Sequence, residues 1–234
     1  RVSGGLRWHQ YHPGLNYAYY HSAYQDYTWE TAFQRSTQTM LYGALKYSKY
    51  GTLQAQMIRL DNYAFFEKSL DSDFFRVLPQ QWNSSINLLK LRWDARQEVG
   101  KFALQTEMLY QKTTQDNVPL HLPDFVGRAT LSYADHWFAK ASFVHLGLSA
   151  KYFSEYYGDA YNPVLSEFVV QHQRKIGGAP IVEAFFNMKI KQTRLYVRAE
   201  HLSSLWDGNT KFSSPDYPYR DFILRFGLVW NFFR

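Results

Sequence analysis

The sequence predicts an all-β fold, namely an antiparallel transmembrane β-barrel of the outer-membrane type with about ten strands in this chain. Three observations predict it. Aromatic residues make up 19% of the 234 residues, long segments alternate apolar and polar side chains, and the connections between them alternate in length. Aromatic residues favour strands, and Tyr and Trp also favour membrane interfaces. No run of 18 apolar residues occurs, so a helical membrane span is excluded.

The last segment, 219–233, shows the alternation most clearly. Successive side chains of a strand point to opposite faces, so every second residue shares a face. One row is wholly apolar and is predicted to face lipid; it contains Leu224, Phe226, Leu228, Trp230 and Phe232. A soluble strand can show such a row once, whereas a transmembrane barrel needs one in every strand, over about 9 to 11 residues.

The pattern recurs along the whole chain. The ten predicted strands are, in order, 1–11, 37–49, 52–66, 83–95, 100–112, 124–135, 138–153, 179–191, 193–203 and 219–233. Apolar rows in seven of the first nine contain, in order, Val2, Leu6 and Trp8; Leu41, Gly43 and Leu45; Phe102, Leu104 and Met108; Phe125, Ala129 and Leu131; Val144, Leu146 and Leu148; Val182, Ala184 and Phe186; and Leu195, Val197 and Ala199. The strands at 52–66 and 83–95 carry adjacent apolar pairs, which indicate bulges or partial burial.

The connections between these strands alternate between long and short. The long ones are 12–36, 67–82, 113–123, 154–178 and 204–218, and the short ones lie near 49–51, 96–99, 137 and 192. Outer-membrane barrels have short periplasmic turns and longer outside loops. We therefore expect a bacterial outer-membrane location, with a periplasmic C-terminus.

The polar rows are rich in charge and are predicted to line the lumen. The predicted lumen-lining residues are Arg7, Lys46, Lys101, Glu107, Arg128, Lys151, Glu183, Lys189, Arg194, Arg198, Glu200, Asp221 and Arg225. Lys191 belongs to the same polar rows. Basic residues outnumber acidic ones in this set, and basic pore linings favour anions. Some charges are expected to pair across strands, for example Glu183 or Glu200 with Arg194 or Arg198.

Composition argues against several other classes of protein and site. The chain has no cysteine, which excludes a disulfide scaffold and a thiolate metal site. Its net charge of +6 is spread singly among apolar residues rather than gathered in a block, so we expect no nucleic-acid partner. A soluble antiparallel sandwich is the competing structural interpretation, but its strands would be shorter, near 5 to 6 residues.

Three groups of residues could carry chemistry or binding. His201 and Ser203 form a His-x-Ser pair, but a Ser nucleophile also needs an oriented His and an oxyanion site, so we expect no enzyme. Carboxylates of the long connections could bind calcium if they converged, yet they lack the spacing of a calcium loop, so no cofactor is expected; they are Asp116, Asp124, Glu155, Asp159, Glu167, Asp207 and Asp216. Tyrosines crowd the first long connection, where they could contact a ligand or pack on one another: Tyr17, Tyr19, Tyr20, Tyr24 and Tyr27.

Residues 118–202, from VPLHLPDF to YVRAEHL, and 216–233, DYPYRDFILRFGLVWNFF, resemble the porin family of Bacteroidota outer membranes. A weaker similarity extends through HPGLNYAYYHS, 12–22. Members of that family are usually longer, so the resemblance implies that 1–234 is one barrel domain from the C-terminal portion of a larger barrel. It also implies a channel for small polar solutes, in contact with outer-membrane lipid.

Two further expectations concern partners. Phe232 and Phe233 resemble the C-terminal signal by which the barrel assembly machinery recognises outer-membrane barrels, although Arg234 departs from the usual terminal aromatic. As an alternative to a channel, a barrel with a closed lumen could hold a protein or lipoprotein partner through its long connections.

Overall fold

A computed structural model describes residues 1–23, 27–48, 50–68, 76–207 and 211–232 of the chain. Ten long strands form one antiparallel sheet, in which each strand pairs with the next one along the chain. In sheet order they are β1 (Val2–Tyr11), β4 (Ser36–Tyr47), β5 (Gly51–Asp61), β8 (Ile86–Val99), β9 (Phe102–Thr113), β10 (Phe125–Trp137), β11 (Ser142–Phe153), β16 (Ile181–Ile190), β17 (Thr193–Glu200) and β20 (Ile223–Trp230). The ten predicted strands and their antiparallel order are confirmed.

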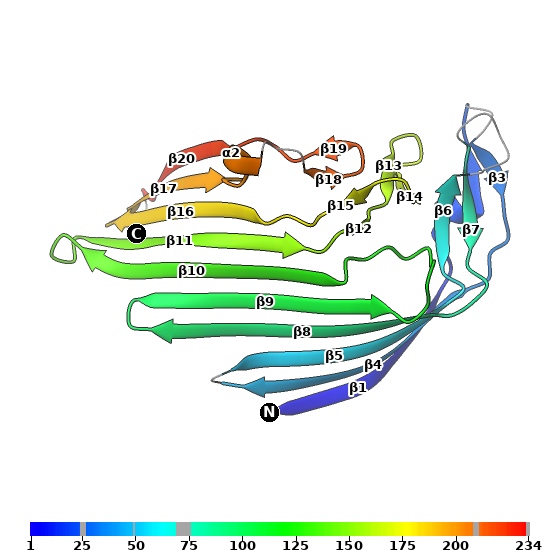
Figure 1. Cartoon of the computed structure of the whole chain (residues 1–234), viewed down its shortest axis with the longest axis horizontal. Helices are drawn as coiled ribbons and strands as arrows, with labels where there is room; N and C mark the ends of the chain where they lie inside the picture. Colours follow the sequence, from blue (N-terminus) through cyan, green and yellow to red (C-terminus); the bar gives the residue numbers. More distant parts are fainter. Residues whose placement is uncertain (24–26, 49, 69–75, 208–210, 233–234) are drawn as a thin grey trace.

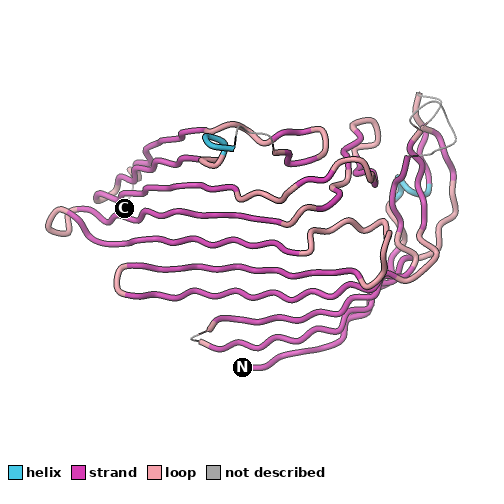
Figure 2. Tube along the Cα trace, in the orientation of Figure 1, coloured by secondary structure: helices cyan, strands magenta, loops and turns pink. Residues whose placement is uncertain are grey.

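The sheet is twisted and open, with β1 and β20 as its two edges (Figure 1). Among the described residues, no pairing joins these edge strands. The short turns gather at one end of the sheet and the long connections at the other (Figure 2). No helix in the described part of the chain is long and apolar enough to cross a membrane.

Several predicted boundaries were wrong, because backbone conformation rather than side-chain alternation ends these strands. The predicted strand 52–66 breaks at Asn62, whose φ of 55° is left-handed, so that β5 is followed by a separate strand, β6 (Ala64–Lys68). Phe138, Ala139 and Lys140 also have positive φ. They form the turn between β10 and β11, in place of the predicted turn at 137.

β8 is longer than predicted. It continues through 96–99, a segment predicted to be a connection, and the turn to β9 instead lies at Gly100 and Lys101. Gly100 has a φ of 62°, a conformation that glycine adopts without steric cost. The extension matters for function because it adds charged residues to one face of the sheet.

The long connections fold into small elements that the sequence pattern did not predict. They are α1 (Leu15–Ala18), β2 (Tyr19–His21), β3 (Thr28–Glu30), β6, β7 (Val77–Gln81), β12 (Tyr156–Tyr157), β13 (Ala160–Asn162), β14 (Glu167–Val170), β15 (Lys175–Ile176), α2 (Ser204–Asp207), β18 (Phe212–Ser214) and β19 (Tyr217–Pro218). A second sheet runs in the order β13-β14-β6-β7. Its parallel pair, β14 and β6, joins the fourth long connection to the second.

We call this second sheet, together with α1, β2 and β3, the loop cap. It has its own hydrophobic core, formed by Trp29, Phe66, Val77, Leu165 and Val169. The cap combines the first, second and fourth long connections, although their parent strands lie apart in the main sheet. β4 and β11 are five strand spacings apart, or roughly 24 Å along the sheet. The cap therefore bridges distant parts of the end from which the long connections emerge (Figure 1).

Candidate functional site: the charged face of the main sheet

The register of the ten strands separates an apolar face from a charged face. Directly paired residues share a face, and the pairing is continuous from β1 to β20. The apolar rows predicted from the sequence all fall on one face, from Leu6 opposite Leu41 to Leu195 opposite Leu228. We call this the apolar face and the opposite one the charged face.

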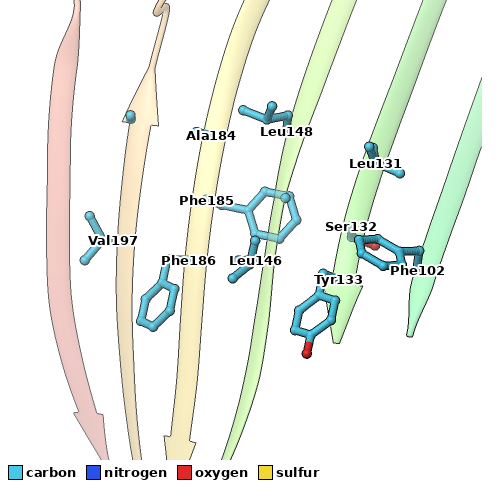
Figure 3. Close-up of a pocket in the computed structure, with 12 residues that line it drawn as sticks. Phe102, Leu131, Ser132, Tyr133, Leu146, Leu148, Ala184, Phe185, Phe186 and Val197 are labelled. Carbon is cyan, nitrogen blue, oxygen red and sulfur yellow. The ribbon is translucent and has the colours of Figure 1, made fainter. Parts of the chain in front are cut away.

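The apolar face is open to its surroundings. Phe226 is 78% exposed and Leu228 is 60% exposed. A shallow apolar groove with a volume of about 420 Å³ lies on this face, across β9 to β17. Figure 3 shows Leu131, Leu148 and Phe186 among the side chains that line it. Soluble monomers rarely expose an apolar surface of this extent, which marks contact with lipid or another protein.

The charged face carries more basic than acidic residues. Within the strands, its eleven basic residues are Arg7, Lys46, Lys90, Arg92, Arg96, Arg128, Lys151, Lys189, Arg194, Arg198 and Arg225. Its five acidic residues are Asp94, Glu98, Glu107, Glu183 and Glu200. The excess of six positive charges equals the net charge of the whole chain. The basic bias predicted from the sequence therefore appears in the register.

β8 contributes five charged residues that the sequence prediction missed. Lys90, Arg92, Asp94, Arg96 and Glu98 occupy every second position and share the charged face. The signal was present as a charged row of period two. It was obscured because the adjacent apolar pair at 88 and 89 made the strand look irregular, and because 96–99 was predicted to be a connection.

Three of the predicted lumen-lining residues lie outside the strands. Lys101 and Lys191 are in turns, where alternation no longer decides side-chain direction. The ammonium of Lys101 bonds the carboxylate of Asp135, which the register places on the apolar face. Asp221 precedes β20, although it lines a cavity on the charged face.

Most acidic residues of the charged face are held by basic neighbours. Lys151 Nζ lies 2.9 Å from Glu183 Oε1. Arg225 Nε lies 3.1 Å from Glu200 Oε2, and Arg198 Nη1 lies 3.8 Å from Glu200 Oε1. The predicted pairing of Glu200 with Arg198 is present, whereas Glu183 pairs with Lys151 rather than with an arginine of β17.

β8 has two such pairs along its own length. Arg92 Nε lies 2.8 Å from Asp94 Oδ2, and Arg96 Nε lies 2.7 Å from Glu98 Oε1. Among the described residues, six basic side chains of the charged face form no ion pair, namely Arg7, Lys46, Lys90, Arg128, Lys189 and Arg194. Within the described structure, the excess positive charge is thus concentrated on groups that form no ion pair.

The fifth long connection folds toward the charged face. A cavity of about 750 Å³ lies between them. Arg128, Lys151 and Glu183 line it from the sheet, and Tyr219 and Arg220 line it from the connection. Burial raises the pKa of the Tyr219 phenol above its ordinary value. The cavity is therefore polar and carries charges of both signs.

His201 and Ser203 do not act as a pair. His201 is buried and its Nδ1 bonds the backbone carbonyl of Arg220. The hydroxyl of Ser203 accepts a 3.4 Å hydrogen bond from the backbone N–H of Val182. Each side chain has a separate partner, and both groups serve the packing of the fifth connection against β16.

The carboxylates of the long connections do not converge. In the described part of the chain, no group of three or more His, Asp or Glu residues is arranged to hold a metal ion. Asp159 instead lies 2.9 Å from His121 Nδ1, and Glu167 accepts a 3.0 Å hydrogen bond from Asn16. The side chain of Asp207 lies outside the described residues.

The tyrosines of the first connection pack largely within the loop cap. Tyr17 stacks on Phe66, with 4.4 Å between ring centroids, and Tyr20 stacks on Trp29 at 5.1 Å. Burial, with Glu167 nearby, raises the pKa of Tyr17 to about 12. Tyr19 is exposed, and Tyr24 lies outside the described residues. Packing rather than ligand contact thus explains Tyr17 and Tyr20.

Comparison with known proteins identifies the family. The whole chain, residues 1–234, matches the protein family described as "Putative porin". The chain belongs to this family. The predicted resemblance to a porin family is confirmed, and the match extends beyond the segments 118–202 and 216–233. No curated protein and no solved structure matches the chain. Porins are outer-membrane proteins, so membership in the porin family indicates that location, and it suggests a non-enzymatic channel or structural protein.

Proposed function

We propose that the chain forms the wall of a transmembrane β-barrel channel that passes small polar solutes and prefers anions. The observation that carries this proposal is the division of ten continuous strands into an exposed apolar face and a basic charged face. In a barrel wall the apolar face contacts lipid, and the charged face lines the lumen. Membership in the porin family supports the same arrangement.

The apolar face supports the membrane part of the proposal. Leu224, Phe226, Leu228, Trp230 and Phe232 are all exposed on the last strand and just beyond it. Covering apolar surface stabilises by about 25 cal/mol per Å². In a bilayer, lipid covers the apolar face. A water-filled lumen would keep the charged face hydrated.

The charged face supports the preference for anions. A lumen with low-dielectric walls focuses the potential of the charges that line it. Six basic residues of this face form no ion pair within the described structure, whereas four of its five acids do. The field in the lumen is therefore expected to be positive.

The arrangement of the connections supports an orientation. Short turns lie at one end of the sheet and long connections at the other (Figure 2). By the rule for outer-membrane barrels, the turns and the C-terminus are periplasmic and the loop cap is outside the cell. The barrel assembly machinery would then meet the last strand, β20, from the periplasmic side.

Reversal potentials in a planar bilayer under a KCl gradient test the function. The full-length protein is expected to show anion preference. A variant with Arg7→Gln, Lys90→Gln and Arg128→Gln should reduce it, because these basic residues of the charged face form no ion pair within the described structure. Lys112→Gln is the matched control, since the register places Lys112 on the apolar face. Cation preference or absence of conductance would overturn the proposal.

The loop cap favours a second candidate function, in which the protein holds a protein or lipoprotein partner and its lumen is closed. The cap has a packed core of its own and still exposes Leu15, Tyr19 and Phe168. Exposed apolar side chains are one feature of docking surfaces. This alternative predicts no conductance, together with a co-purified partner that Tyr19→Ser and Phe168→Ser release.

A further inference from the structure

Three pairs of basic residues stand directly opposite each other on the charged face. They are Arg128 with Lys151, Arg198 with Arg225, and Lys189 with Arg194. Directly opposed residues have Cβ atoms about 4.5 to 5.5 Å apart, and like charges at that distance destabilise the sheet. A negative charge close to each pair would offset that repulsion.

Two of the pairs obtain that charge from the protein. Glu183 bonds Lys151 at 2.9 Å, and Glu107 stands opposite Arg128 in the ladder. Glu200 contacts both Arg225 and Arg198. In these two cases the repulsion is offset by carboxylates of neighbouring strands.

The third pair has no such partner among the residues that the structure describes. Lys189 and Arg194 flank the turn between β16 and β17, and neither forms an ion pair within the described residues. A cavity of about 350 Å³ lies at this position instead. Its lining consists of Lys189, Arg194, Asn187, His145, Phe143 and Met188, none of which is acidic.

The donors in this lining suit an oxyanion. The ammonium of Lys189 offers three N–H donors and the guanidinium of Arg194 offers five in a planar fork, which matches the oxygens of phosphate or carboxylate. The Asn187 amide adds N–H donors from β16, two residues before Lys189 on the same face. Because Lys189 and Arg194 are directly opposed and line the same cavity, one small anion there can contact both.

We infer that Lys189 and Arg194, with Asn187, form a binding site for a small oxyanion of the phosphate class at the turn end of the charged face. This inference deepens the proposed anion preference and rests on that function for its role in transport. A phosphate group would bind at this site while it passes through the lumen. Binding itself does not require conduction, so it can be measured separately.

Calorimetry on the purified full chain in neutral detergent at low ionic strength tests the site. Inorganic phosphate is expected to bind and to raise the thermal unfolding temperature. Lys189→Gln combined with Arg194→Gln should weaken binding by about tenfold or more, because charged hydrogen bonds to the anion are lost. The same double variant should be more stable than the unchanged protein without phosphate, since the repulsion is removed.

Lys46→Gln is the matched control, because Lys46 lies on the same face at the same end of the sheet and forms no ion pair within the described residues. It should bind phosphate as the unchanged protein does. Equal weakening in the control would indicate a diffuse field and overturn the site, as would absence of binding. A short-chain phosphatidylglycerol forms the last arm: binding of this lipid without binding of phosphate would overturn a solute site. Phosphate binding without conductance would contradict the channel and leave the site standing.

Discussion

The side-chain amide of Asn16 donates a 3.0 Å hydrogen bond to the carboxylate of Glu167, across 151 residues of sequence. This bond joins the first long connection to the fourth. Tyr20 adds a second link, because its hydroxyl donates a 2.8 Å hydrogen bond to the backbone carbonyl of Val164. The loop cap is thus a folded unit with polar contacts around an apolar core.

Phe66→Ala should unfold the loop cap without dispersing the main sheet. Phe66 is 0% exposed and its ring contacts both Tyr17 and Trp29. Truncating a buried phenylalanine costs about 3 to 5 kcal/mol. That cost is comparable to the whole stability that a small hydrophobic core supplies. Hydrogen exchange should show lost protection in the cap and retained protection in the ten strands. Phe168→Ala, at an exposed position of the same cap, should leave both unchanged; protection lost equally in the two variants would contradict the assigned core.

Arginine substitutions on β20 should distinguish the two faces. Leu228→Arg places a charge on the apolar face and should cost about 2 to 4 kcal/mol near the bilayer midplane. Val229→Arg places the same charge on the opposite face, where water is accessible, and should cost less. Urea unfolding from lipid vesicles measures both free energies of unfolding. Equal losses at the two positions would count against a membrane wall.

Single cysteines should report the orientation, since the chain contains none of its own. Asp216 is exposed in the fifth long connection, and Gln192 is exposed in the turn after β16. A membrane-impermeant maleimide should label Asp216→Cys in intact cells and should reach Gln192→Cys only after the outer membrane is opened. The inverse labelling pattern would reverse the topology.

Alkaline pH should loosen the loop cap through Tyr17. Burial raises the pKa of this phenol to about 12 from an ordinary value of 10.0. A pKa raised by folding gives stability that is complete below the unfolded value and is lost as pH rises through the folded value. Proteolysis of the cap should therefore increase between about pH 10 and pH 12. Tyr17→Phe should reduce that increase because it has no proton to lose; an unchanged pH profile would show that Tyr17 is not the group responsible.

The sequence predicted the ten strands and both faces of the main sheet because each strand shows its own alternation of apolar and polar residues. Alternation of period two is a local property, readable in Phe226 and Leu228 without knowledge of any neighbour. Charged rows are equally local. The row from Lys90 to Glu98 was missed because the apolar pair at 88 and 89 disturbed the apolar alternation and because 96–99 was predicted to be a connection. The breaks at Asn62 and at 138–140 depended on backbone conformations that side-chain alternation does not report.

Only the tertiary structure decided which distant residues meet. The sequence suggested that tyrosines crowd the first connection, but it could not show that Tyr17 packs on Phe66 of another connection, because no periodicity links two irregular segments. Register likewise decided that Lys189 stands opposite Arg194, where neither forms an ion pair within the described residues, while Lys151 pairs with Glu183. Alternation determines which face a residue occupies, and hydrogen bonding between strands determines its neighbour on that face.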